Sequence, residues 1–364
     1  MQLGFDVPAH WPDNGHPIEN LFPELIEQAK LAEKIGFDAF FLAEHHFNDY
    51  FVQPSPFALA SHLAAVTKKP RIIIAVIVLP LHDVRRLAGE ITMTDHLTRG
   101  RLEVGFGRGG AQFESDCFGL PFEKARESME DKLKALLILL KGQDVSYDGP
   151  YAKYPEITVM PPPLQKPHPP LWLSVIRTDA AYHCGLQGYS VQTGALRRPI
   201  AVQKELIAAF RKGAAESGSK PGAQKISLSQ IIYVAKNDSD VKEKLEMVYA
   251  NQQRFMSQFI TAGIVKGGKV VPIEIDDTIE SLSESVIVGS PDYCVDRLLA
   301  LKELGYDALS LRTNFGPVHE DIMGSLDRFG EHVMPYLGVG SGAAGRISPS
   351  DARRPPPARG PSGA

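Results

Sequence analysis

The chain has 364 residues, of which 43% are hydrophobic and 23% charged, so it is long enough to bury a large core. Its net charge of −4 excludes a strongly basic surface for nucleic acid or an anionic membrane, which leaves small molecules as the expected ligands. No membrane-spanning run or secretory leader is apparent, and three scattered cysteines predict reduced thiols in a cytoplasmic protein.

Strand-like and helix-like patterns alternate along the chain. Residues 3–6 predict a first strand, and residues 21–35 predict a helix because their apolar positions recur at helical spacing. The later apolar runs are strand-sized, and helical patterns follow them. Strands are predicted at 40–42, 71–79, 102–106, 171–174, 226–234 and 309–311, and helices at 124–140, 178–186, 239–259 and 292–304.

One joint between a helix and the next strand recurs. Gly36, Gly188 and Gly305 each end a helical pattern, and an aromatic residue that can pack against the following strand comes next. Glycine supplies the left-handed conformation that stops a helix. Because this αβ joint spans almost the whole chain, we predict a single (β/α)8 TIM barrel over residues 1–337 rather than a nucleotide-binding half and a separate lobe.

Three segments break the alternation. Residues 142–170 are rich in Pro and Tyr and predict an excursion over one mouth of the barrel. Residues 263–289 contain Gly267-Gly268 and five acids, which is typical of a mobile lid inserted over the carboxyl-terminal face. Residues 338–364 consist mainly of Gly, Pro, Ser, Ala and Arg, and we expect a disordered tail there.

Polar residues follow the predicted strand at 40–42. Glu44, His45 and His46 stand where the carboxyl ends of parallel strands open toward a binding crevice. An imidazole at such a place can be a base, a hydrogen-bond donor, a metal ligand or a packing residue. Adjacent histidines do not converge on one metal, and no His-x-His or Cys-x-x-Cys spacing completes a site, so we predict no metal. Neighbours in an extended segment face opposite ways, so one of the two histidines is expected to be structural.

Two later strand ends predict anion sites. Arg108 stands among the four glycines of residues 105–110, so backbone amides and a guanidinium can approach one phosphate or an electron-rich ring. Arg177 precedes a helix start whose free amides form a second anion site, with Thr178 as the expected N-cap. No dinucleotide-binding fingerprint is present. A phosphate cradle beside a base predicts an enzyme with a phosphorylated cofactor.

These motifs together resemble the bacterial luciferase-like flavin monooxygenases, from about Gln2 to Leu337. The resemblance is specific because several stretches match in the same order. They are Glu44-His45-His46-Phe47, residues 75–80, the run from Asp95 through Gly109, Leu311-Arg312-Thr313-Asn314-Phe315-Gly316, and residues 334–337.

The resemblance implies a role for each matching position. His45 falls on the catalytic base, Glu44 on a neighbour that orients the site, and His46 becomes a supporting residue. Gly107 stands where luciferase has a reactive cysteine, so light emission is not expected. The cofactor positions are Arg108 at the flavin phosphate, Val175, Ile176, Arg177 and Thr178 in the loop that completes the phosphate site, and Ala75-Val76 as a non-prolyl cis peptide beneath the flavin ring.

The resemblance also implies an activity. Reduced FMN, supplied by a separate NAD(P)H-dependent flavin reductase, would react with O2 through a peroxyflavin and oxygenate a small organic substrate in a cytoplasmic homodimer. Two alternatives stay open. One is a deazaflavin-dependent dehydrogenase or reductase of the same fold, against which the Glu-His-His-Phe motif favours FMN. The other is a non-catalytic flavin-binding partner subunit, against which His45 and Arg108 argue.

Overall fold

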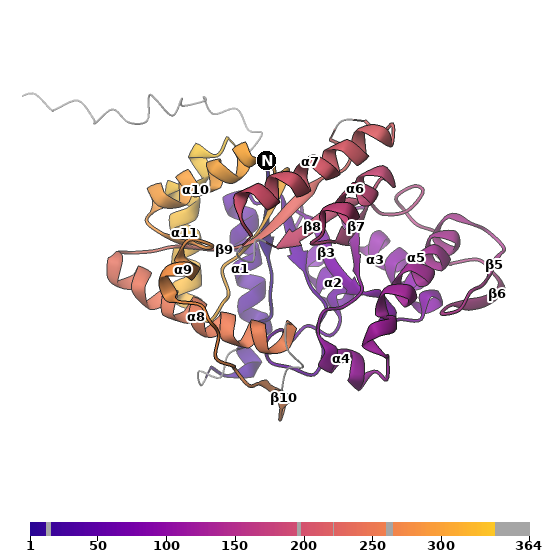
Figure 1. Cartoon of the computed structure of the whole chain (residues 1–364), viewed down its shortest axis with the longest axis horizontal. Coiled ribbons are helices and arrows are strands. Elements are labelled where there is room, and N and C mark those ends of the chain that lie inside the picture. The colour runs from indigo at the N-terminus through magenta and orange to yellow at the C-terminus, as the bar shows by residue number, and fades with distance from the viewer. Residues whose placement is uncertain (12–15, 195–197, 221, 260–264, 339–364) are drawn as a thin grey trace, which may run out of the picture.

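Eight parallel strands close into a barrel, which confirms the predicted (β/α)8 fold (Figure 1). The computed structural model describes residues 1–11, 16–194, 198–220, 222–259 and 265–338. Pairing of β8 with β9 closes the ring. The barrel strands are β1 (Gln2–Asp6), β2 (Ala39–Leu42), β3 (Arg71–Val78), β4 (Leu102–Gly107), β7 (Leu171–Ser174), β8 (Ser190–Gly194), β9 (Ile226–Val234) and β13 (Ala308–Arg312).

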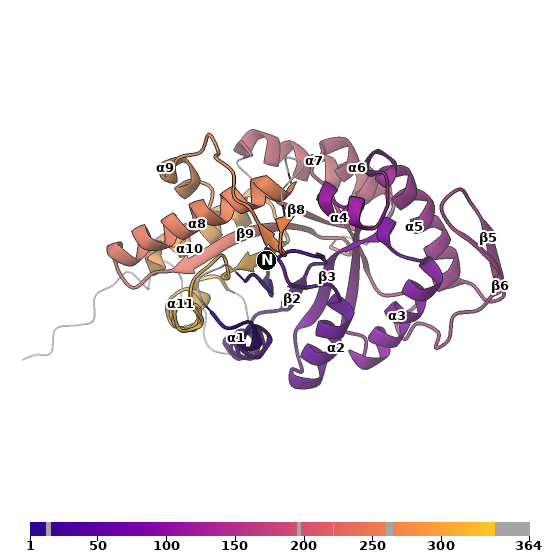
Figure 2. The same ribbon diagram turned by 90° about the horizontal axis from the view of Figure 1, so that it is seen from below.

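Helices surround the barrel strands (Figure 2). In the part of the chain that the structure describes, none of them is long and apolar enough to cross a membrane. The longer ones are α1 (Leu21–Ile35), α2 (Pro56–Val66), α3 (Val84–Leu97), α5 (Ala125–Lys141), α6 (Thr178–Leu186), α7 (Ile200–Glu216), α8 (Asp238–Phe259), α10 (Pro291–Leu304) and α11 (His319–His332). The shorter elements are α4 (Gln112–Cys117), α9 (Ile279–Ser283), β5 (Val145–Asp148), β6 (Lys153–Ile157), β10 (Val265–Lys266), β11 (Lys269–Val270), β12 (Ile287–Gly289) and the 3-10 helices Ile18–Asn20, Leu79–Leu81, Phe122–Lys124 and Met334–Tyr336.

The repeated glycine joint forms as predicted. Gly36 and Gly305 are the left-handed C-caps of α1 and α10, with φ of +110° and +109°. Strand side chains then alternate between two layers. Those that face outward pack under the helices, whereas Phe41, Ile73 and Trp172 pack together in a separate small cluster. A Cβ at Gly4 of β1 would collide with the Phe41 ring, so only glycine leaves room for that ring.

The hairpin within residues 142–170 does not cover a mouth of the barrel, so the prediction is wrong for that part of the segment. The hairpin β5–β6 lies beyond α5 at the edge of the molecule (Figure 1). Asp131 of α5 holds it there, because its carboxylate accepts hydrogen bonds from Tyr147 Oη at 2.7 Å and Tyr151 N at 2.9 Å. The return segment reaches the amino-terminal end of β4, where Gln165 Nε2 donates to Leu102 O at 2.7 Å.

The predicted lid at 263–289 contains several elements. Residues 263 and 264 lie outside the described residues, as do residues 339–364 of the predicted tail. The hairpin β10–β11 and the helix α9 follow. Ile287–Gly289, however, forms β12 and pairs in parallel with β9, so these last three residues belong to the sheet and not to an insertion.

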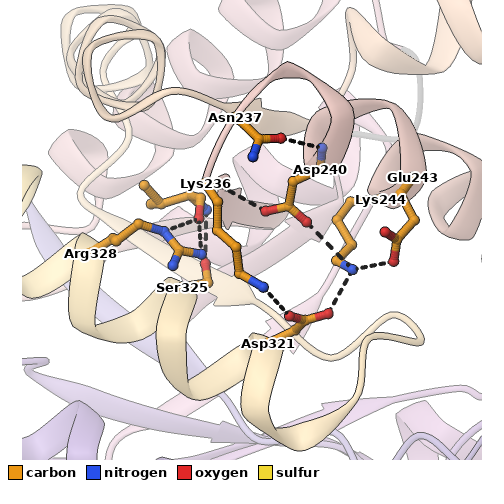
Figure 3. Close-up of polar contacts among 9 residues, drawn as sticks. Lys236, Asn237, Asp240, Glu243, Lys244, Asp321, Ser325 and Arg328 are labelled. Atoms are coloured by element: carbon orange, nitrogen blue, oxygen red, sulfur yellow. Dashed lines mark hydrogen bonds and ion pairs between the residues drawn. The ribbon is translucent and has the colours of Figure 1, made fainter.

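Helix α8 is fixed to α11 by a network of charged side chains (Figure 3). Lys244 Nζ lies 2.8 Å from Asp321 Oδ2, 2.6 Å from Glu243 Oε1 and 3.5 Å from Asp240 Oδ1, and its side chain is only 1% exposed. Lys236, before α8, binds the other oxygen of Asp321 at 2.7 Å. A buried lysine keeps its charge only when acids compensate it, so this network sets the position of α8 against the barrel.

We predict that Lys244→Met destabilises the fold by about 3 kcal/mol or more, because it leaves Asp321 and Asp240 without their buried cation. Lys236→Met is the matched control, since Lys236 binds the same acid but is 51% exposed, and it should cost under about 1 kcal/mol. Urea denaturation followed by circular dichroism compares the two. Equal midpoints for the two variants would contradict a structural role for the buried lysine.

Candidate active site at the carboxyl-terminal mouth

His45 follows β2 and is held by Glu114 of α4. Its Nδ1 lies 3.0 Å from Glu114 Oε1, and the same oxygen accepts the N–H of His46 at 2.9 Å and Asn48 Nδ2 at 3.1 Å. Glu114 is only 2% exposed. A carboxylate oxygen accepts hydrogen bonds, so Nδ1 is the nitrogen that donates to Glu114, and Nε2 is the nitrogen that can exchange a proton. The pair therefore has the chemistry of a general base and its orienting acid.

The ring of His45 is also fixed by packing. It stacks on Phe51, with the ring centroids 5.1 Å apart and an angle of 21° between the planes. Phe51 is buried, and the guanidinium of Arg312 lies 5.0 Å from the same ring. Packing and a hydrogen bond together leave the imidazole little rotational freedom, which is what a positioned proton carrier requires.

Glu44 is the partner of the second histidine. Its buried carboxylate accepts hydrogen bonds from His46 Nε2 at 2.8 Å, His82 Nε2 at 2.7 Å and Val78 N at 2.6 Å. Burial alone would raise the pKa of Glu44, but the bonds from His46, His82 and Val78 outweigh it and lower that pKa to about 2. Glu44, which directly precedes His45 in the sequence, thus connects the end of β2 to the end of β3.

Strands β3 and β4 form a floor without large side chains. The Ala75–Val76 peptide is cis, as the sequence resemblance implied, and the pairing register between β3 and β4 shifts between Ile74 and Ile77. A Cβ at Gly105 would lie 2.6 Å from Ile74 O, and one at Gly107 would lie 2.7 Å from Val76 Cγ2. Glycine is therefore required at both positions for the strands to approach this closely, and the floor can accommodate a flat ring.

Arg108 stands directly after β4 and is exposed. Its guanidinium lies 5.3 Å from the Phe122 ring, and it forms no ion pair with any other residue in the described ranges. Val175, Ile176 and Arg177 connect β7 to α6, and β7 pairs with β4, so both predicted anion-binding segments lie at neighbouring strand ends. A guanidinium with open donors beside a helix start fits a phosphate group.

The expected N-cap at Thr178 is wrong. Helix α6 begins at Thr178, and Arg177 is the N-cap, without a capping hydrogen bond from its side chain. Arg177 instead binds Asp179, with Nη2 2.7 Å from Oδ2, and both side chains are exposed. Arg177 has the extended φ and ψ angles of an N-cap residue, and Thr178 is therefore the first residue with helical geometry.

Several groups at the mouth have no signal in the sequence. Glu114 is separated from His45 by 69 residues, and α4 is too short for its face to be assigned from periodicity. His82 and Asn48 likewise contact the site only through the fold. The inward position of Arg312 is the exception, because alternation along β13 places Ser310 and Arg312 on one face.

Comparison with known proteins agrees with this geometry. Residues 1–308 match the family model described as luciferase-like monooxygenase. The oxygenase component of the flavin-dependent trigonelline monooxygenase from Acinetobacter baylyi is 28% identical, over 87% of this chain and 90% of its own length. Monooxygenase RslO1 from Streptomyces bottropensis has the same fold, with a TM-score of 0.82 at 23% identity over 93% of this chain and all of its own.

An F420-dependent secondary alcohol dehydrogenase also shares the fold. Its TM-score is 0.72 at 19% identity, and the match covers 93% of this chain and 99% of the dehydrogenase. At this identity the likeness concerns the fold alone.

We predict that Glu44→Gln flattens the acid limb of the stability profile. Because the pKa of Glu44 is lowered from 4.5 to about 2, its charge stabilises the folded state above pH 4.5, and this contribution is lost as the pH falls toward 2. The difference corresponds to about 3 kcal/mol. Thermal unfolding measured from pH 7 to pH 2 should show a lower stability for the variant at pH 7 and a smaller loss on acidification.

Glu90→Gln is the control for this experiment, since Glu90 lies on the surface of α3 in an i,i+4 pair with Arg86. Its profile should follow that of the unmodified protein. Parallel profiles for Glu44→Gln and the unmodified protein would show that Glu44 carries no such linkage.

Proposed function

We propose that this chain, which belongs to the luciferase-like monooxygenase family, oxygenates a small organic substrate with reduced FMN and O2. The chain is a flavin-dependent oxidoreductase by its relatives. The name of the Acinetobacter relative describes an oxygenase component, which supports the proposal that a separate NAD(P)H-dependent reductase supplies the reduced flavin. The homodimer stays a prediction from the resemblance.

The observation that carries the proposal is that an imidazole held in one orientation lies at the strand end next to the glycine floor. His45, oriented by Glu114, follows β2, and the floor is formed by the next two strands, β3 and β4. Bound reduced flavin would supply the electrons that activate O2. The role proposed for His45 is to hold or move a proton at Nε2 beside that ring, and the role of Glu114 is to keep Nδ1 protonated.

The remaining site residues divide into two groups by position. Glu44 holds His46 and His82 and so fixes the loop that presents His45. On the other side, the proposed phosphate contacts are the Arg108 guanidinium and the backbone of the β7–α6 connection, and the proposed ring contact is the Ala75–Val76 floor. The β7–α6 connection and the first residue of α6 comprise Val175, Ile176, Arg177 and Thr178.

Besides proton transfer and cofactor binding, we propose that the protein excludes water from the site. The hairpin β10–β11 is tied to the mouth, because Val270 N donates to Asp49 Oδ1 at 2.9 Å. Val265, Val270 and Phe255 pack with Tyr50 and Phe51 in one apolar cluster. A lid made of this hairpin would keep solvent from activated oxygen, since water favours its unproductive loss as hydrogen peroxide.

We expect anaerobic titration with reduced FMN to quench tryptophan fluorescence with saturation, and Arg108→Met to weaken that binding by about tenfold. Turnover with a supplied flavin reductase, NADH, ¹⁸O2 and a substrate panel should place ¹⁸O in the product. Failure to bind reduced FMN would contradict the proposal. Binding of a reduced deazaflavin instead, with hydride transfer that is indifferent to O2, would establish the dehydrogenase alternative.

His45→Gln should lower substrate oxygenation by roughly 10²- to 10⁴-fold, the range for loss of a positioned proton carrier. Glu114→Gln, which keeps the shape but not the charge of the orienting group, should lower it by about 10- to 100-fold. Both variants should still bind reduced FMN, so the defect should appear in product formation and in greater hydrogen peroxide release. His332→Ala, on the surface of α11, is the control, and turnover of His45→Gln equal to that control would remove His45 from the mechanism.

A further inference from the structure

Arg312 lies at the mouth on the side of the barrel away from the proposed phosphate site. The strand order runs β13, β1, β2, β3, β4, so Arg312 at the end of β13 and Arg108 after β4 are four strands apart in a ring of eight. His45, after β2, lies between them. If a flavin extends from Arg108 across the β3–β4 floor, Arg312 stands beyond His45, where the substrate would lie.

Three neighbours contact the guanidinium of Arg312. Nε donates to Asp6 Oδ2 at 3.1 Å from the adjacent strand, with Asp6 in direct register, and the group lies over the Phe51 ring at 5.0 Å. Tyr50 also interacts with the Arg312 side chain. A guanidinium has five N–H donors, so these contacts leave donors unused, and the side chain is 20% exposed.

A structural role alone does not account for this arrangement. Burying an Arg–Asp pair costs desolvation that an apolar pair of the same volume would avoid. Here the pair stands at the end of two barrel strands rather than in the packed layer beneath them, and the arginine keeps partial access to solvent. A pre-oriented planar guanidinium with open donors is the group that proteins use to bind a carboxylate.

Helix α8 brings further unpaired donors to the same region. Arg254 binds Asp49 and lies 5.9 Å from the Tyr50 ring, but its Nη1 is buried without a partner among the described residues. One turn later on the same face, Gln258 is 2% exposed, and within the described ranges neither its Nε2 nor its Oε1 has a hydrogen-bond partner. The pKa of His10 is lowered to about 3, mainly by burial and secondly by the nearby charge of Arg254. His10 is therefore neutral and adds no charge here. Buried donors without partners are uncommon, and these two, on Arg254 and Gln258, lie where a ligand beside Arg312 could satisfy them.

We propose that Arg312, supported by Arg254, is a substrate subsite that binds a carboxylate carried by a small, mainly apolar molecule. This inference rests on the proposed function, which it deepens by naming the substrate class. The carboxylate is held by the guanidinium of Arg312 on one side of His45, and the carbon that is oxygenated then faces the flavin side.

The test measures binding without flavin, so that it is independent of the proposed function. Isothermal titration calorimetry compares benzoate and hexanoate with their neutral amides, benzamide and hexanamide. At least one acid should bind at least tenfold more tightly than its amide, and Arg312→Met should weaken that acid by about 10- to 100-fold without affecting the amide. Arg86→Met, at an exposed arginine on α3, is the matched control and should leave binding unchanged.

Arg312→Met leaves Asp6 unpaired, so a second measurement uses the unmodified protein. An arginine-directed dicarbonyl reagent followed by peptide mapping should label Arg312 more slowly when the acid is present, while its amide gives no protection and Arg86 is labelled at the same rate in both. Inorganic phosphate should protect Arg108 rather than Arg312. If neither acid binds better than its amide, or if Arg312 is not protected, the subsite is overturned even where reduced FMN binds. If Arg312 binds the acid but reduced FMN does not bind, the proposed function fails instead.

Discussion

The structure of the mouth depends on one carboxylate oxygen, Glu114 Oε1. It holds the imidazole of His45, the backbone of His46 and the amide of Asn48 at once, so a short helix after β4 fixes the whole loop after β2. Asn48 in turn accepts the N–H of Tyr50 through Oδ1 at 3.1 Å. The aromatic pair Tyr50 and Phe51, which separates His45 from Arg312 and α8, is therefore oriented by the same residue. Loss of the Glu114 carboxylate would therefore loosen His45, the loop after β2 and the aromatic pair together.

Much of the fold could be predicted from the sequence, because the signals are local and repeated. The glycine joints at Gly36 and Gly305 take the left-handed conformation that their position requires, and the strand patterns match buried strands. The hairpin within residues 142–170 was misplaced because its position depends on Asp131, an acid on another element. The last residues of the predicted lid were misplaced for a similar reason, since the three residues of β12 are recognisable as a strand only beside β9.

The candidate site, like the fold, could be predicted from the sequence only in part. His45 and Arg108 follow apolar strands, and that position alone predicts that they face the crevice. The partners Glu114, His82 and Arg254 come from helices and loops whose faces depend on tertiary packing, and no spacing rule links them to His45. The partner of Glu44 depends on tertiary packing in the same way. Sequence proximity suggests Glu44 beside His45, whereas the turn after β2 directs Glu44 to His46 and His82.

The first and last turns of helix α8 have separate roles. Its first turns are bound to α11 through Lys244 and Asp321, and its last turns bring Asn251, Arg254 and Gln258 toward the mouth. The described residues of the Lys244 network come from α8, α11 and the turn before α8, and none of them stands at the strand ends that carry His45 and the glycine floor. Side chains along the last turns of α8 can therefore be exchanged, which changes the lining of the mouth, without disturbing the Lys244 network that holds the helix to α11.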